Sequence, residues 1–191
     1  GALNAKGIKT SYSTPGASLW VSSFGGEYGV DNNYINTSGT NLDPAILTTD
    51  QSGCSQGYAS PAGGRKYNAF NDYDNPHPEN PNCNYITTFN GTSSAAPNVS
   101  GAIALMLEAN PALTWRDVKH ILASTSRQID ADRYYAHATG ITQYEWETNA
   151  AGYTHHNWYG FGSLDTAAAV SAAKAYTAGS LGDFNDTGYI G

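Results

Sequence analysis

The densest hydrophobic pattern in the chain predicts a helix between Pro97 and Asn110. Its apolar positions cover most of a helical circumference: Val99, Ile103, Leu105, Met106 and Leu107. Pro97 is compatible with a first turn, because an N–H there has no partner within the helix. A helix with an apolar surface nearly all round is typical of the middle of a fold. We therefore expect a buried central helix in this part of the chain.

Two further helices are predicted after it in the sequence. Thr114 and Asp117 have the spacing of a capping box, and the apolar residues that follow lie on one stripe, namely Trp115, Val118, Ile121 and Leu122. This pattern predicts an amphipathic, peripheral helix. A glycine turn then precedes an alanine-rich segment, which predicts a third helix over roughly Asp165 to Tyr176.

Short strands are predicted ahead of the first helix. Residues 17–24 form a strand-like segment that ends at two glycines, and its adjacent apolar residues 19–21 suit a parallel sheet covered on both faces. Residues 31–43 are rich in Asn, Gly, Ser and Thr, and predict a surface loop. A second short strand is expected over residues 45–49.

Residues 52–85 predict a long, locally ordered loop, because their Gly, Pro, Asn, Asp and Tyr residues follow no sustained period. Cys54 and Cys83, the only cysteines, stand at its two ends. An even pair in such a chain favours a disulfide, with two free thiols as the alternative. Closing a loop of this size would contribute about 3 to 4 kcal/mol in the chain-entropy model.

Three acidic residues in this loop, Asp72, Asp74 and Glu79, are candidate oxygen ligands for calcium. Hard cations favour clusters of carboxylate and amide oxygens. A solvated turn rich in Asp and Asn explains the same residues, and the sequence leaves both interpretations open.

Composition narrows the function classes. The net charge is −7 and the nine Lys and Arg residues are scattered, so we expect no nucleic-acid partner. The longest apolar run, 102–107, is far shorter than the roughly 20 residues that would cross a bilayer, so we expect no membrane span. Fourteen Tyr, four Trp and 21 Gly beside little Lys or Glu favour a secreted or periplasmic protein.

A hydroxyl cluster stands at the start of the first predicted helix, where Gly91 is followed by Thr92, Ser93 and Ser94. A serine in the first turn of a helix has free backbone N–H groups and the positive end of the helix dipole beside it. Both would stabilise an oxyanion formed by nucleophilic attack, provided that a base comes from elsewhere. The alternative is that Thr92 or Ser93 simply caps the helix.

The full string "NGTSSAAPNVSGAIALMLEANP" resembles the nucleophile segment of the subtilisin-like serine proteases. The resemblance implies that Ser93 is the nucleophile and that its own N–H is one oxyanion donor. The strings "TSYSTPGASLWVSSFGGE", "ILTTDQSGC", "LEANPALTWRDVKHILASTS" and "WYGFGSLDTAAAV" are similar to the kexin and furin branch, in the same order. Together these segments span most of residues 10–173.

The resemblance implies an α/β fold with a parallel sheet, of which residues 1–178 would be the C-terminal part. Residues 52–85 would then be a loop insertion, and residues 179–191 a linker or the start of another domain. Every matching segment belongs after the family's oxyanion-hole asparagine. The catalytic aspartate and histidine and that asparagine are therefore expected upstream of Gly1, and the isolated chain is expected to be inactive.

Local residues are not expected to replace the missing ones. The tripeptide 186–188 reproduces the family's aspartate motif, but it lies in a polar tail after the serine. None of His77, His120, His155 and His156 has the flanking sequence of the catalytic histidine. We expect the missing N-terminal part, or a second copy, to associate with an apolar sheet edge left exposed.

The resemblance also implies a substrate. The kexin branch cleaves peptides and proteins after basic residues, and Thr92 and Asp50 match positions assigned to substrate binding. The 54–83 loop, which leads directly to the Ser93 segment, would border the primed side of the cleft. No cofactor is expected for the chemistry, although family members commonly bind structural calcium. A binding module that grips carbohydrate or protein through its aromatic loops is the alternative to an enzyme.

Overall fold

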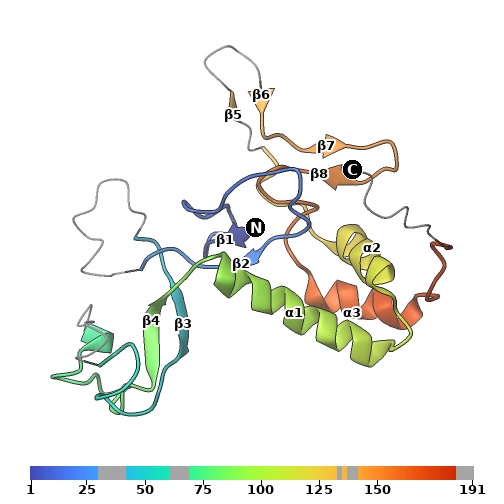
Figure 1. Cartoon of the computed structure of the whole chain (residues 1–191). Helices are drawn as coiled ribbons and strands as arrows, with labels where there is room; N and C mark the ends of the chain where they lie inside the picture. Colours follow the sequence, from blue (N-terminus) through green and yellow to red (C-terminus); the bar gives the residue numbers. More distant parts are fainter. Residues whose placement is uncertain (30–41, 61–68, 133–134, 137–141, 184–191) are drawn as a thin grey trace, which may run out of the picture.

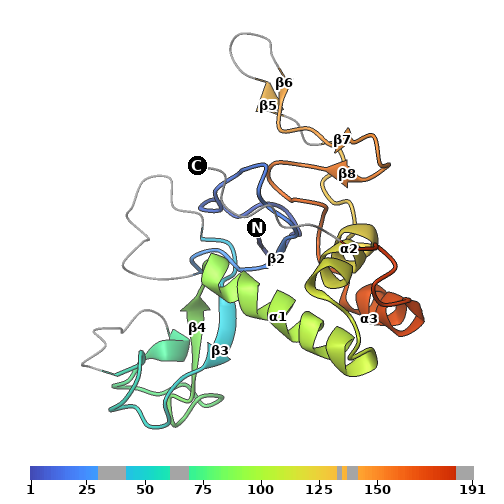
Figure 2. The same cartoon turned by 45° about the vertical axis from the view of Figure 1, so that its right-hand side comes forward.

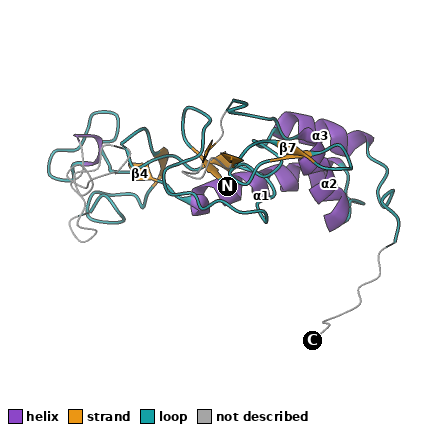
Figure 3. Cartoon of the chain, turned by 90° about the horizontal axis from the view of Figure 1, so that it is seen from above, coloured by secondary structure: helices purple, strands orange, loops and turns teal. Residues whose placement is uncertain are grey.

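The computed structural model describes residues 1–29, 42–60, 69–132, 135–136 and 142–183. Three helices occupy one side of the molecule, and an extended strand pair stands on the other (Figures 1 and 2). Viewed from above, helices and strand pair lie at opposite ends of an elongated chain (Figure 3). This arrangement of helices and small sheets fits a partial α/β fold.

The three helices enclose the main hydrophobic core. They are α1 (Thr92–Ala109), α2 (Trp115–Thr125) and α3 (Thr166–Ala175). Helix α3 lies along both α1 and α2, and buries its alanine face against them (Figure 1). The buried core residues are Val21, Met106, Leu113, Val118, Ile121, Leu122, Ala169 and Ala173. The predicted second and third helices are confirmed. Of the stripe predicted for α2, Val118, Ile121 and Leu122 are buried, whereas Trp115 is 60% exposed.

The second helix starts with the predicted capping box, and the third starts with a cap that was not predicted. The Thr114 hydroxyl accepts from the Asp117 N–H, and the Asp117 carboxylate accepts from the Thr114 N–H, which completes the capping box. The Asp165 carboxylate accepts from the Ala168 N–H at the start of α3. These caps fix the direction in which both helices leave their loops.

The first helix differs from its prediction. Only Ser94, Ala95, Ala102 and Met106 are buried along α1. Leu105 and Leu107 are 47% and 38% exposed, although α3, β1 and β2 pack against α1. The expectation of an enclosed central helix is therefore wrong for this chain, and one apolar face of α1 meets solvent.

A parallel strand pair leads toward the start of α1. β1 (Ala2–Leu3) pairs in parallel with β2 (Ser23–Phe24). The expected strand over residues 17–24 is confirmed only at its end, because the segment before Val21 forms turns. Parallel pairing itself is confirmed, and an isolated parallel bridge between Ser22 and Ser163 extends it.

The predicted long loop is anchored by an antiparallel strand pair. β3 (Ile46–Thr49) pairs with β4 (Tyr85–Phe89), and the chain between them contains the short 3₁₀ helix η1 (Ala69–Asn71). The disulfide Cys54–Cys83 forms as predicted, with 4.9 Å between its Cα atoms. We call residues 46–89, from β3 to β4 with the disulfide between them, the disulfide arm. Among its described residues, the only buried hydrophobic cluster consists of Ala59, Cys83 and Ile86.

Two hairpins were not predicted. β5 (Tyr135–Ala136) pairs with β6 (Thr142–Gln143), and β7 (Glu147–Thr148) pairs with β8 (Thr154–His155). The second hairpin leads into an aromatic cluster around buried Tyr159 and His156, against which the Trp146 ring packs.

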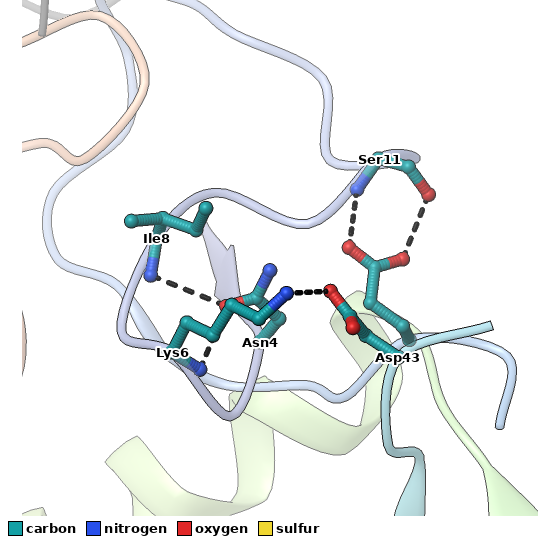
Figure 4. A network of polar contacts seen from close by, with 6 residues as sticks. Asn4, Lys6, Ile8, Ser11 and Asp43 are labelled. Carbon is teal, nitrogen blue, oxygen red and sulfur yellow. Dashed lines mark hydrogen bonds and ion pairs between the residues drawn. The ribbon is translucent and has the colours of Figure 1, made fainter. Parts of the chain in front are cut away.

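Polar contacts fold the N-terminal segment back on itself (Figure 4). The Asn4 side chain accepts from the N–H groups of Lys6 and Ile8. Lys6 also forms an ion pair with Asp43 at 2.7 Å. The N–H and hydroxyl of Ser11 both donate to the carboxylate of Glu27, which is fully buried.

Candidate active site

Ser93 lies exposed in the first turn of α1, where β4 ends and the helix begins (Figure 1). The N-cap residue of this helix is Gly91, and no side chain caps it. The exposed hydroxyls of Thr92 and Ser93 are therefore not used as caps. This finding removes the capping explanation of the hydroxyl cluster.

The backbone around Ser93 leaves donors available. The Gly91 carbonyl accepts from the N–H groups of Ser94 and Ala95, at 2.9 and 3.3 Å. Within the described residues, no acceptor is paired with the N–H of Ser93. That N–H stands at the positive end of an 18-residue helix, which favours negative charge beside it. An oxyanion formed next to Ser93 would meet this donor.

The turn before Ser93 is fastened to the end of β2. The Gly91 N–H donates to the carbonyl of Gly25 at 3.1 Å and to the phenol oxygen of Tyr12 at 2.9 Å. One helical turn further on, the Asn98 amide donates to the carbonyl of Phe24 at 3.1 Å. Two points on either side of Ser93 are thus held by one short stretch of chain.

Tyr12 is half-buried beside this turn. Burial raises the pKa of the Tyr12 phenol, against an opposing effect of the hydrogen bond from Gly91. The phenol is therefore neutral at physiological pH, and can donate one hydrogen bond while it accepts another.

An apolar cavity of about 570 Å³ adjoins the same helix turn. Helix α1 contributes one wall, and the segments 12–14 and 19–21 contribute the other. The α1 residues that line it are Thr92, Ala95, Ala96, Val99 and Ser100. Its walls suit further polypeptide that packs against α1, more than a charged ligand.

The described histidines have partners away from Ser93. His77 accepts from the Glu79 N–H, and the His120 ring lies 3.2 Å from the Tyr153 hydroxyl. The His155 ring contacts the Leu19 carbonyl at 3.0 Å, and buried His156 accepts from the Trp158 N–H.

Because no histidine of the described residues contacts Ser93, this part of the structure supplies no base for it. The aspartate-like tripeptide 186–188 lies outside the described residues.

Asp50 lies at the opposite end of the β3–β4 pair from Ser93. Its N–H pairs with the Asn84 carbonyl, just before β4 begins, whereas Ser93 follows the other end of that strand. The length of β4 alone separates the two by about 14 Å. The Asp50 carboxylate accepts from the N–H groups of Gln51 and Ala59, and so stabilises the start of the long loop.

The candidate calcium ligands do not converge in the structure. Among the described residues, no group of three or more His, Cys, Asp or Glu side chains is arranged to hold a metal ion. The Asp72 carboxylate accepts from the N–H groups of Asp74 and Asn75, which is the hydrogen bonding of an Asx turn. At Asp72 and Asp74, the structure therefore shows the turn that was the alternative to a cation site.

Sequence reasoning missed the contacts of Tyr12, Gly25 and Asn98. All three join segments more than 60 residues apart, and their local patterns carry no signal of that pairing. The glycine pair 25–26 was interpreted only as the end of a strand. Nothing in the residues around this glycine pair indicates that the Tyr12 phenol contacts its carbonyl groups.

Comparisons with known proteins agree with this geometry. Residues 9–162 match the Subtilase family. The extracellular serine protease of Aeromonas sobria is 35% identical over 190 residues, which cover 90% of this chain and 27% of that protein. The rat proprotein convertase subtilisin/kexin type 5 is 46% identical over 87 residues, which cover 46% of this chain and 4% of that protein.

Solved structures give the same result. A crystal structure of the Aeromonas sobria serine protease superposes with a TM-score of 0.72 at 34% identity, over 93% of this chain and 29% of that one. A second, with a TM-score of 0.71, is a complex of that protease with a chaperone. The chain spans only 27% of the Aeromonas sobria protease and 4% of the rat convertase. In the described residues, no helix has the length and apolar character needed to cross a membrane. The family match and the superposition together establish that the chain belongs to the subtilase family.

Proposed function

We propose that this chain supplies the nucleophile of a subtilisin-like serine endopeptidase. The observation that carries the proposal is the exposed Ser93, in a helix turn that uses neither its hydroxyl nor its N–H. A hydroxyl left out of the cap and out of the core is open to a substrate and to a base.

The reaction follows from this arrangement. The Ser93 oxygen attacks the carbonyl carbon of a peptide while its proton passes to a histidine supplied by polypeptide beyond this chain. The resulting oxyanion accepts a hydrogen bond from the Ser93 N–H. Collapse of the tetrahedral intermediate expels the amine, which takes up the proton, and water then hydrolyses the acyl-enzyme. An aspartate outside this chain would orient the histidine.

The open face of α1 supports the proposal that the triad is completed by a separate part of the catalytic domain. Exposed Leu105 and Leu107 and the apolar cavity beside Thr92 offer a surface for polypeptide that packs against the nucleophile helix. The isolated chain should therefore carry the nucleophile without being able to activate it.

The proposed specificity is a class of peptide substrate. Cleavage after basic residues is inferred from the similarity to kexin-like proteases, and Thr92, exposed beside Ser93, is proposed to contact substrate. Asp50 is proposed to contact substrate on the resemblance alone, because it lies at the other end of β4 from Ser93. The arm closed by the disulfide is proposed to contact the primed side of a bound substrate. Deleting residues 57–80 from the complete enzyme should then alter primed-side preference, and an unchanged preference would contradict this.

Secretion is proposed as well, supported by the disulfide and by the extracellular relative from Aeromonas sobria. No cofactor is proposed for the chemistry. Structural calcium at the long loop has no support from the described residues, because the Asp72 carboxylate already accepts two backbone N–H groups there.

Labelling with a fluorophosphonate probe tests the proposal. In protein that contains this chain together with the upstream half, the probe should attach to Ser93, and Ser93→Ala should abolish labelling. Ser171→Ala is the matched control, since it removes an exposed hydroxyl on α3 and should leave labelling unchanged. The isolated chain should label little or not at all. Full-rate labelling of the isolated chain would contradict the assignment of the base to other polypeptide.

A further inference from the structure

The phenol oxygen of Tyr12 lies between the glycines that follow β2 and the turn that begins at Gly91 and contains Ser93. It accepts from the Gly91 N–H at 2.9 Å, and its single proton is shared between the carbonyl oxygens of Gly25 and Gly26, at 2.9 and 2.6 Å. A single oxygen atom thus bridges three backbone groups from two segments about 65 residues apart.

The backbone at this contact leaves no room for an alternative support. A Cβ built on Gly25 would come within 2.8 Å of the Gly91 carbonyl oxygen and 3.0 Å of the Tyr12 hydroxyl. Gly91 itself has a φ of 117° and a ψ of 165°, a region that side chains rarely adopt. Neither glycine can therefore supply a polar side chain to hold the turn. Besides the Gly25 carbonyl, which accepts from the Gly91 N–H at 3.1 Å, the Tyr12 phenol holds this amide with the shorter contact of 2.9 Å.

Tyr12 is itself firmly positioned for this task. The preceding residue, Ser11, gives both its N–H and its hydroxyl to the buried Glu27 carboxylate, at 2.8 and 2.7 Å (Figure 4). The Tyr28 ring packs edge-on against the Tyr12 ring at 5.9 Å. Because these contacts constrain both backbone and ring, the phenol oxygen has a defined location relative to Gly91.

Gly91 stands two residues before Ser93 and begins the helix turn that contains it. The orientation of the Gly91 peptide group therefore influences the directions of the Ser93 hydroxyl and the Ser93 N–H. We propose that Tyr12 is a positioning residue for this reaction: its phenol oxygen fixes the Gly91 amide, and thereby the direction of the oxyanion donor. The inference rests on the proposed function, since it concerns the geometry of the same serine. Tyr12 needs no contact with the substrate to act in this way.

Tyr12→Phe tests the proposal in the assembled protease that contains this chain and the histidine-bearing half. The substitution keeps the ring and its packing on Tyr28, and removes only the bridging oxygen. A small misorientation of reacting groups lowers rates by up to about 100-fold. We expect kcat for a peptide ester and the fluorophosphonate rate constant to fall by about 10- to 100-fold, with KM within about twofold of the parent.

A transition-state analogue separates positioning from general stability. A peptide boronate forms a tetrahedral adduct on the serine, so its affinity should fall by the same factor as kcat. The final amount of probe bound reports the folded fraction, so a variant that folds poorly loses amplitude while the rate constant still describes the folded molecules. Tyr153→Phe is the control, because it removes a phenol that contacts His120 beside α2 and should leave all three measurements unchanged.

The outcomes are distinct. A fall in kcat and boronate affinity at constant KM supports the positioning role. A rate within about twofold of the parent overturns it, and so does a rise in KM alone, which would make Tyr12 a substrate contact. A parent enzyme that fails to label at Ser93 overturns the proposed function and this inference with it.

Discussion

The disulfide arm offers a quantitative test of how the chain divides into stable units. The buried hydrophobic cluster of the arm consists of Ala59, Cys83 and Ile86 within the described residues, whereas the helical core contains eight buried residues. Replacing Cys54 and Cys83 together by alanine should therefore affect the arm far more than the helices. The change removes the covalent closure and keeps small side chains at both positions.

The magnitude follows from the length of the closed loop. A sequence separation of 29 residues corresponds to a loss of about 3.6 kcal/mol from chain entropy at 25 °C. That free energy is equivalent to about a 400-fold change in the equilibrium between closed and open arm. With so few buried apolar groups, the arm depends otherwise on hydrogen bonds, chiefly those of buried Asn71 and Asn80 to Tyr85 and Thr87 of β4.

Hydrogen exchange read by mass spectrometry measures the effect. Peptides that cover residues 50–60 and 80–86 should exchange about two orders of magnitude faster in the double alanine variant, while α3 peptides keep their protection. Chemical reduction of the parent protein should give the same pattern and is the matched control. Equal loss of protection in α3 would refute the reasoning, because arm and helices would then unfold as one unit. Unchanged exchange in the arm would refute it as well.

Two further predictions concern backbone and charge. Gly160→Ala would place a Cβ against the Trp20 carbonyl, whereas a Cβ on Gly152, at a φ of 84°, meets no atom within 4 Å. We expect Gly152→Ala to lower the free energy of unfolding by about 1 kcal/mol, because of its φ alone. Gly160→Ala should lower it by about 1–3 kcal/mol more, because of the steric clash. Urea denaturation checks the pair, and equal losses would contradict the steric argument. Hydrogen bonds, chiefly from the Thr114 backbone, hold the pKa of the Asp117 carboxyl below its ordinary value of 3.8. The ionised carboxylate therefore stabilises the folded protein above that pH, and this stabilisation is lost as the pH falls through the lowered pKa. Asp117→Asn should therefore weaken the decline in unfolding free energy below about pH 4, and an identical pH dependence in both proteins would argue against this role.

The sequence was most informative where structure depends on neighbours along the chain. The capping box at Thr114 needs only four adjacent residues, and it was found at its predicted place. The third helix also begins beside Asp165, where its start was predicted. The pairing of Cys54 with Cys83 depends on a long separation, but the chain has no other cysteine to choose. In each case the number of alternatives was small.

It was least informative where partners lie far apart. The pattern of α1 correctly indicated a helix suited to burial, yet the exposure of Leu105 depends on which elements surround it. The Tyr12 phenol meets Gly91 across 79 positions, and no local periodicity encodes that meeting. For the candidate site, the motif identified Ser93, while the residues that hold its turn became visible only in three dimensions.

The uncapped start of α1 has a consequence for engineering. Serine or asparagine at an N-cap commonly adds about 1 kcal/mol to helix stability, but the backbone angles of Gly91 exclude such a residue there. The turn that presents the proposed nucleophile therefore lacks the stabilisation that a side-chain cap would add, as is common where activity and stability compete. Attempts to make the protein more heat-resistant should leave this glycine alone, and strengthen the anchor formed by Asn98 on Phe24 instead.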